Sequence, residues 1–169
     1  NYRYDTPENV FDRHAYPKGG RVLHMLRFEL GEEPFWRAIR RYAEVNQFRT
    51  VETADLRIAI EDATGQGLNW FFDQWFFKEG QPELKVEYDY DEEYKEVVVS
   101  VEQVQDPKQM PGVFVLPVDF DIYVDGKMTR HKFRIDQRTS SFRIPATKDP
   151  DLIVFDGDGV LLADVQEEK

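Results

Sequence analysis

The stretch that decides the fold of this chain is Trp75-Phe76-Phe77-Lys78-Glu79-Gly80-Gln81-Pro82. Before it, apolar residues recur at the three- and four-residue spacing of amphipathic helices. After it, they alternate with polar residues, as in half-buried strands. Glycine and proline are the residues that most often interrupt regular structure. We therefore predict a boundary at this stretch, with a helical domain over residues 1–81 and a β-domain over residues 82–169.

The helical part predicts four helices. The backbone N–H groups in the first turn of a helix have no acceptor within the helix, so proline, which lacks this group, is well tolerated there. The first helix is therefore predicted to begin at Pro17. Thr53 has the side chain of a good N-cap. The fourth helix is apolar on nearly every side, which indicates burial on several sides. The four helices are expected over about residues 17–30, from 32–34 onward, from Thr53 to Gly65, and over about 69–78.

The β-part predicts seven short strands. Asp125-Gly126 is a strong hairpin signal between two of them. Seven short strands with turn residues between them favour an antiparallel, immunoglobulin-like β-sandwich, so the fold class is α+β. The expected strands cover residues 84–90, 97–101, 118–124, 129–135, 142–144, 152–156 and 160–163.

Composition excludes several classes of protein. The 169 residues carry a formal net charge of −11, most of it after residue 80, so phosphate would be repelled and nucleic acid is not expected as a partner. There is no cysteine, so no disulfide or thiolate metal site can form. No apolar run approaches the roughly 20 residues needed to span a bilayer. The sequence does not determine the cellular compartment, because its composition is compatible with both a cytoplasmic and a periplasmic location.

A set of motifs in fixed order resembles peptidase family M1, the zinc aminopeptidases that include aminopeptidase N and leukotriene hydrolase. The resemblance is good over about residues 14–90, and beyond them it rests on the strand pattern. It implies the helical C-terminal part of a thermolysin-like catalytic domain, followed by the sandwich. The motifs are Tyr16-Pro17-Lys18-Gly19-Gly20, Val22-Leu23-His24-Met25-Leu26-Arg27, Leu30-Gly31-Glu32-Glu33-Pro34-Phe35-Trp36, Thr53-Ala54-Asp55-Leu56 and Phe72-Asp73-Gln74-Trp75, with Gly80 and Pro82.

The resemblance implies one catalytic residue in this chain, Tyr16. In the family, this tyrosine donates a hydrogen bond to the oxyanion of the tetrahedral transition state, a role that suits a phenol because it stays protonated at neutral pH. From the residues alone, a tyrosine packed at a helix start is the commoner explanation. Lys18 is expected to have a structural role near the helix start. Some relatives have a second tyrosine five residues before the first, where this chain has Phe11.

The full-length protein would then remove N-terminal residues from peptides, using one zinc ion and a glutamate general base. This chain has no H-E-x-x-H, and His14, His24 and His131 lack the spacing of metal ligands. The chain alone is therefore expected to bind no zinc and to be inactive without the missing N-terminal part of the catalytic domain. The alternative is a non-catalytic scaffold or interaction module of the same family that has lost its zinc site.

Two acidic stretches admit a weaker metal interpretation. Asp156-Gly157-Asp158-Gly159 hints at a calcium loop, but its glycine spacing differs from an EF-hand, so a hairpin turn is expected. Asp89-Tyr90-Asp91-Glu92-Glu93 is expected to be a solvated loop between two strands, with a weak cation site as the less favoured interpretation.

Overall fold

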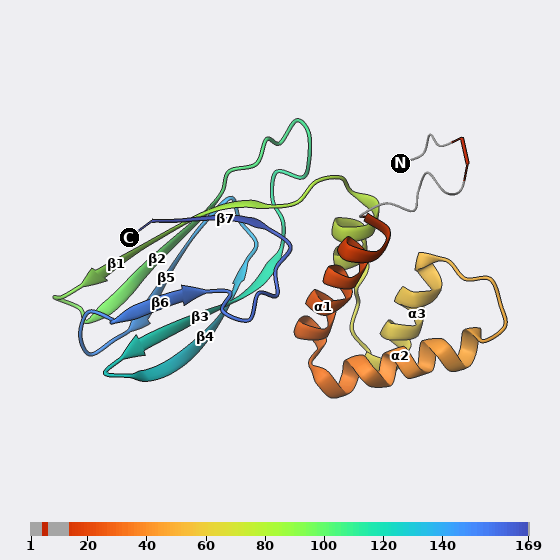
Figure 1. Cartoon of the computed structure of the whole chain (residues 1–169), viewed down its shortest axis with the longest axis horizontal. Coiled ribbons are helices and arrows are strands. Elements are labelled where there is room, and N and C mark those ends of the chain that lie inside the picture. The colour runs from red at the N-terminus through yellow and green to blue at the C-terminus, as the bar shows by residue number, and fades with distance from the viewer. Residues whose placement is uncertain (1–4, 7–13, 169) are drawn as a thin grey trace. The chain divides into compact units, whose positions relative to one another are not determined.

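The computed structural model describes residues 5–6 and 14–168 (Figure 1). Two compact units make up the chain, Asn1–Phe77 and Lys78–Lys169. Every described helix lies in the first unit and every described strand in the second, so the fold is α+β, as the change of sequence period predicts. None of the helices in the described ranges is both long and apolar enough to cross a membrane.

Within the described residues, the helical unit contains four α-helices and two π-helical turns. α1 follows directly on the π-helical turn η2, so this helix begins at His14, three residues before the predicted start. The predicted fourth helix is α4 followed by η3. The elements are η2 (His14–Lys18), α1 (Gly19–Leu30), α2 (Glu32–Asn46), α3 (Thr53–Thr64), α4 (Asn69–Phe72) and η3 (Asp73–Phe77).

The start of α3 corrects one expectation. Thr53 is the first helical residue, and Glu52 is the N-cap. The Glu52 backbone N–H donates to the Asp55 carboxylate at 2.8 Å, which is the reciprocal half of a capping box. The helix ends as predicted at Gly65, whose φ of 72° is readily adopted by glycine.

An ion cluster links the end of α1 to the start of α2. Arg27 Nε donates to Glu32 Oε1 at 2.6 Å, and Trp36 Nε1 donates to Glu32 Oε2 at 3.1 Å. The hydrogen bond from Arg27 lowers the pKa of the Glu32 carboxyl. The Arg27 guanidinium also lies over the Trp36 ring, 5.5 Å from its centroid. These residues of the sequence motif therefore have a structural role at the α1–α2 corner.

The core of the helical unit is built mainly from α1 and the aromatic segment α4–η3. Trp70, Phe71 and Trp75 form a chain of ring contacts at centroid distances of 5.5 and 6.5 Å. Phe71, Phe72 and Trp75 are buried, but Phe76 and Phe77 are exposed, so the predicted burial on several sides holds for only part of this segment. The buried apolar residues of the unit are Val22, Met25, Leu26, Leu30, Phe35, Ala38, Ala59, Ile60, Leu68, Phe71, Phe72 and Trp75.

The second unit is a sandwich of two sheets. One sheet has the order β5-β2-β1-β7 and the other β4-β3-β6. The chain winds from the β1–β2 hairpin to the β3–β4 hairpin and then alternates between the sheets. The strands are β1 (Glu83–Asp91), β2 (Glu96–Gln103), β3 (Leu116–Val124), β4 (Lys127–Ile135), β5 (Thr139–Pro145), β6 (Leu152–Phe155) and β7 (Asp164–Glu168).

The last strand differs from the prediction in place and direction. Residues 160–163 form no strand, although Val160 and Leu161 are buried. β7 begins at Asp164 and pairs parallel to β1, whereas every other pairing is antiparallel. Residues 160–163 therefore contribute apolar side chains to the core without forming a strand themselves. Residues in an irregular segment can be buried in this way.

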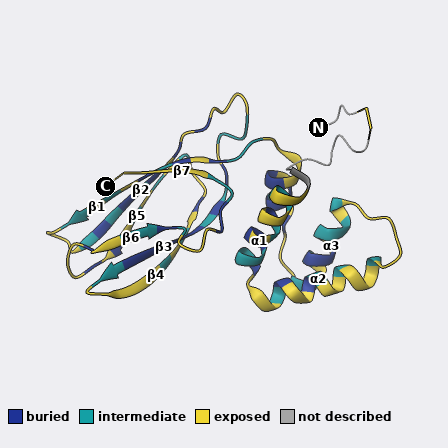
Figure 2. Ribbon diagram, in the orientation of Figure 1, coloured by how far each residue is buried: buried dark blue, intermediate teal, exposed yellow. Residues whose placement is uncertain are grey.

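Phe120 lies at the centre of the sandwich. Its ring on β3 contacts Phe155 and Phe133 in its own sheet, at centroid distances of 5.1 and 5.9 Å. It also contacts Phe142 and Tyr88 in the opposite sheet, at 6.4 and 6.5 Å. Aromatic pairs in these tilted and edge-to-face arrangements stabilise by roughly 0.5–1.5 kcal/mol beyond area burial. Along β2, buried positions alternate mainly with positions of intermediate exposure (Figure 2).

Gly80 turns the chain just before β1. Its φ is 86°, a conformation that side chains with a Cβ rarely adopt. A Cβ built there would also lie 2.5 Å from Met110 Cβ and 2.8 Å from Met110 Sδ. Glycine is therefore required at this position by both backbone conformation and space.

We predict that Gly80→Ala destabilises the chain by about 2 kcal/mol or more, because left-handed strain and overpacking add. Gly67→Ala is the matched control, since a Cβ at Gly67 meets nothing within 4 Å and its φ is not positive. Thermal unfolding of both variants measures the difference. A Gly80→Ala variant no less stable than Gly67→Ala would refute the requirement for glycine.

Asp119 and Asp121 are buried carboxylates on β3, next to Arg130 of β4. The Arg130 guanidinium donates two hydrogen bonds of 2.7 Å to the Asp121 carboxylate. Its Nη1 lies 3.6 Å from Asp119 Oδ2. Neither carboxylate oxygen of Asp119 has a hydrogen-bond partner among the residues that the structure describes. Burial raises the pKa of Asp119, because the charged form loses its hydration.

This shift predicts a pH-dependent effect of Asp119→Asn. A raised folded-state pKa gives stability at low pH that is lost as the pH rises through that pKa. The melting temperature of the variant relative to the unmodified chain should therefore increase from about pH 4 to pH 7. Exposed Asp136 supplies the control variant Asp136→Asn, for which the difference should stay flat. An equally flat difference for Asp119→Asn would contradict the assignment.

Candidate functional site

Tyr16 lies in the π-helical turn η2, directly before α1. Pro17, inside the same turn, cannot donate the backbone hydrogen bond of a regular helix, which fits a locally widened turn. Single π-helical turns are rare and occur frequently at functional sites. The Tyr16 side chain is 71% exposed, so its ring is not sealed within the helical core.

The surface beside Tyr16 is open in the part of the chain that the structure describes. Pro17 and Gly20 are exposed, and Lys18 is half-buried at the N-cap of α1. A Cβ added at Gly19 or Gly20 would meet no heavy atom within 4 Å. This first helical turn can therefore be approached closely by another molecule or segment. Phe11, the position of the second tyrosine in some relatives, lies outside the described residues.

The histidine side chains that the structure describes are not part of a group of metal ligands. His24 is exposed on α1, whereas His131 lies on β4 in the other unit, where it pairs with Phe120 in the sheet register. His131 Nε2 is 3.2 Å from Thr129 Oγ1 on the same inward face. The side chain of His14 is outside the described residues. Within the described ranges, no group of three or more His, Cys, Asp and Glu side chains could hold a metal ion, so the residues present do not fit zinc.

The Asp156–Gly159 segment is a tight turn, but not the predicted hairpin. Gly159 N–H donates to Asp156 O at 2.7 Å, while the Asp156 carboxylate accepts from the N–H groups of Val160 and Leu161 at 2.8 and 2.9 Å. Asp158 pairs with Arg130. The strands on either side, β6 and β7, belong to different sheets. The carboxylates of this segment therefore stabilise the turn and the neighbouring strand.

Two hollows were not foreseen from the sequence, since each joins segments that are distant along the chain. One lies in the sandwich unit and combines the acidic stretch at the β1–β2 turn with residues 148–153. The other, of about 540 Å³, lies between α2 and α3 and is lined by Arg37, Arg40, Arg41, Glu44, Asp62 and Ala63. Arg37 is paired there with Glu33 at 2.9 Å. The charged residues of both hollows resemble ordinary surface positions in the sequence.

Comparison with known proteins agrees with the motif pattern. Residues 2–75 match the sequence model of the peptidase family M1 domain. The chain is 36% identical over 84 residues to aminopeptidase N of Lactococcus lactis, which is 49% of this chain and 10% of that protein. It is 34% identical over 85 residues to the Tricorn protease-interacting factor F2 of Thermoplasma volcanium, which is 50% of this chain and 11% of that protein.

A solved structure shares the fold. The crystal structure of Legionella pneumophila aminopeptidase A in complex with aspartic acid superposes with a TM-score of 0.83 at 19% identity, covering 98% of this chain and 19% of that one. This chain therefore shares the fold of a segment of that protein. Residues 2–75, slightly less than half of the chain, are therefore similar in sequence to the peptidase family M1 domain. It spans about a tenth of the length of the curated relatives named above.

We predict that this chain binds no stoichiometric zinc, because structural and catalytic zinc sites need three or four convergent ligands. Elemental analysis of protein dialysed without chelator should find well below one zinc ion per chain. A tight, equimolar zinc ion would contradict the prediction and require ligands from residues outside the described ranges.

Proposed function

We propose that this chain is part of a zinc-dependent aminopeptidase that hydrolyses N-terminal residues from peptides, and that Tyr16 is its oxyanion donor. Residues 1–81 would form the helical end of the catalytic domain, and residues 82–169 the β-sandwich domain after it. The observation that carries the proposal is the exposed Tyr16 phenol on a π-helical turn within the family segment. Aminopeptidase names among the relatives support it.

The proposed chemistry of Tyr16 follows from the reaction. When water adds to the carbonyl carbon of the scissile peptide bond, the carbonyl oxygen becomes an oxyanion. The phenol O–H donates a hydrogen bond to that oxygen, and the bond strengthens as negative charge develops. Because the gain is greater in the transition state than in the bound substrate, the phenol lowers the barrier rather than only tightening binding.

Placement on a helix start suits this role. α1 is anchored by the buried side chains of Val22, Met25 and Leu26 in its first two turns. A donor carried by a rigid element needs little reorganisation when the charge forms. The open surface at Gly19 and Gly20 leaves room for the opposite wall of a cleft.

The remaining catalytic groups must come from outside this chain. The zinc ion of the family would supply electrophilic chemistry, but the described residues do not fit it. A general base and groups that bind the substrate's N-terminus are likewise expected from the missing N-terminal part of the catalytic domain. By itself the chain should be inactive.

The alternative is a scaffold or interaction module of the same family without a zinc site. One relative carries the name of a protease-interacting factor. Reading the gene upstream of Asn1 separates the two functions. An H-E-x-x-H motif with a further glutamate on the next helix would establish the zinc enzyme, whereas their absence would favour the scaffold.

In the full-length protein, Tyr16→Phe should lower kcat by about 10² to 10³, the scale for one oxyanion donor, with little change in KM. Zinc content and thermal stability should stay the same, because the ring is kept and the phenol is no ligand. Steady-state kinetics on an aminoacyl arylamide, with metal analysis, measures these quantities.

Tyr94→Phe is the matched control, because Tyr94 is similarly exposed, at 66%, but lies on the β1–β2 turn. It should leave both constants unchanged. If Tyr16→Phe retained a near-normal kcat, Tyr16 would be a structural residue of the helix start. An equal loss in the Tyr94 variant would indicate a general effect of removing a hydroxyl.

A further inference from the structure

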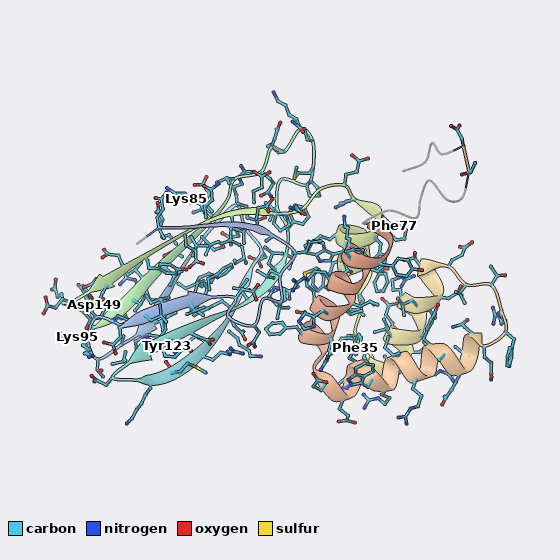
Figure 3. The ribbon with its side chains drawn as sticks, viewed as in Figure 1. Phe35, Phe77, Lys85, Lys95, Tyr123 and Asp149 are labelled. Carbon is cyan, nitrogen blue, oxygen red and sulfur yellow. The ribbon has the colours of Figure 1, made fainter. Side chains whose placement is uncertain are left out.

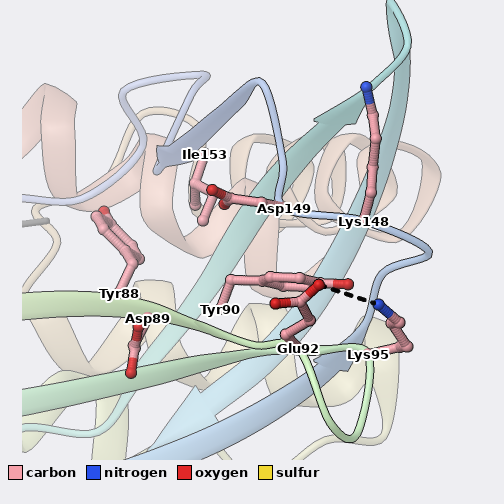
Figure 4. A pocket seen from close by; sticks show the side chains of 8 residues that line it. All are labelled: Tyr88, Asp89, Tyr90, Glu92, Lys95, Lys148, Asp149 and Ile153. Atoms are coloured by element: carbon pink, nitrogen blue, oxygen red, sulfur yellow. Dashed lines mark ion pairs between the residues drawn. The ribbon is translucent and has the colours of Figure 1, made fainter.

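A hollow of about 440 Å³ lies at one end of the sandwich (Figure 4). It is formed where the turn between β1 and β2 meets the segment that leads into β6. Figure 3 shows Lys95 and Asp149, which come from these two segments, at the same end of the unit. The lining residues are Tyr88, Asp89, Tyr90, Glu92, Lys95, Lys148, Asp149 and Ile153.

Two tyrosine rings provide the apolar part of the hollow, together with Ile153. The Tyr90 hydroxyl donates to the Ala146 carbonyl at 3.3 Å, and the Tyr88 hydroxyl donates to the Glu167 carboxylate. Both hydroxyls are therefore engaged elsewhere. What the hollow offers to a ligand is ring surface, and ring faces attract cations.

Lys95 shows that the hollow accommodates a positive charge. Its ammonium lies 6.0 Å from the Tyr90 ring centroid and 3.9 Å from the Glu92 carboxylate. The backbone of Lys95 has a φ of 55°, where glycine or asparagine is usual after a turn. Its carbonyl accepts the Ala146 N–H at 2.9 Å, which fixes this residue between the two segments. The turn thus holds a lysine at a position that its backbone does not favour.

The remaining charge at the hollow is negative. Lys148 Nζ is held by Asp125 at 2.7 Å and Asp151 at 3.4 Å, and it points away from the other lining side chains (Figure 4). Asp89 and Asp149 form no ion pair with any of the described residues. The acidic excess of residues 81–169 adds a field that attracts cations.

We propose that this hollow binds the cationic side chain of a peptide, an arginine guanidinium above all, which stacks on Tyr90 in the place of the Lys95 ammonium. A planar guanidinium matches a ring face and can reach Glu92 and Asp149 beside it. Lys95 acts as an internal competitor that occupies the ring until such a side chain arrives. The hollow is separate from Tyr16, so the inference does not depend on the proposed catalysis.

Binding is expected to be weak and sensitive to salt. The Glu92 side chain is 88% exposed, so its attraction for a cation is screened by water and ions. An affinity on the order of millimolar is reasonable for one stacked guanidinium at such a site. NMR detects binding of that strength.

The 169-residue chain, labelled with ¹⁵N, is titrated with Nα-acetyl-arginine amide. Saturable shifts are expected for the amides of residues 88–95 and 148–153, and added salt should weaken them. Nα-acetyl-citrulline amide has nearly the same shape without the charge and should give no saturable shift. Equal shifts with both probes would overturn the proposal and would indicate that the hollow binds a neutral ligand. The absence of shifts with the arginine probe would overturn it as well.

Lys95→Asn tests the competitor, because asparagine tolerates this backbone conformation better than lysine. Removal of the internal cation should tighten arginine binding roughly two- to fivefold, the scale of one exposed cation–π contact. Lys108→Asn, at an exposed lysine on the loop between β2 and β3, should change nothing. Unchanged or weaker binding in Lys95→Asn would refute the competitor role.

Tyr90→Leu and Asp149→Asn test the ligand contacts. Tyr90→Leu should abolish saturable shifts, and Asp149→Asn should weaken binding about twofold or more. Asp149 is exposed, so its variant keeps the fold even if Tyr90→Leu does not, and the amide spectrum checks both. Undiminished binding in folded forms of both variants would exclude this hollow as the site.

Discussion

The β-sandwich depends on the contacts of one ring, Phe120. This side chain is fully buried and meets rings from two strands of each sheet, so it fixes how the sheets face each other. Removal of such a side chain from a core typically costs 3–5 kcal/mol. Tyr88 belongs to this cluster and also lines the hollow at the end of the sandwich. The hollow is therefore supported directly by the core.

The helical unit shows the opposite arrangement at its proposed site. Phe71, Phe72 and Trp75 of α4 and η3 are buried, whereas Tyr16 is exposed on a π-helical turn. Tyr16 is 71% exposed on a helix start that buried residues of α1 anchor. The proposed function rests on this exposed placement.

Much of the fold could be predicted from local sequence signals. The stop at Gly65 and the Asp125-Gly126 hairpin between β3 and β4 are confirmed. The start of α3 was predicted one residue late, because the N-cap is Glu52 and not Thr53. The Glu52 backbone N–H donates to the Asp55 carboxylate in a capping box that the sequence reasoning did not foresee. The strand over 160–163 was wrong because a buried apolar run does not reveal whether its backbone pairs with a neighbour.

By itself, the sequence determined the period of each half, the position where that period changes and the identity of the family motifs, since these are properties of neighbouring residues. Tertiary structure alone decided that β7 pairs parallel to β1, that Gly80 lies close to Met110, and that Tyr90 and Lys95 line the same hollow as Asp149. Those relations join residues separated by 30 to 81 positions, and such relations are selected by packing of the whole unit rather than by local propensity.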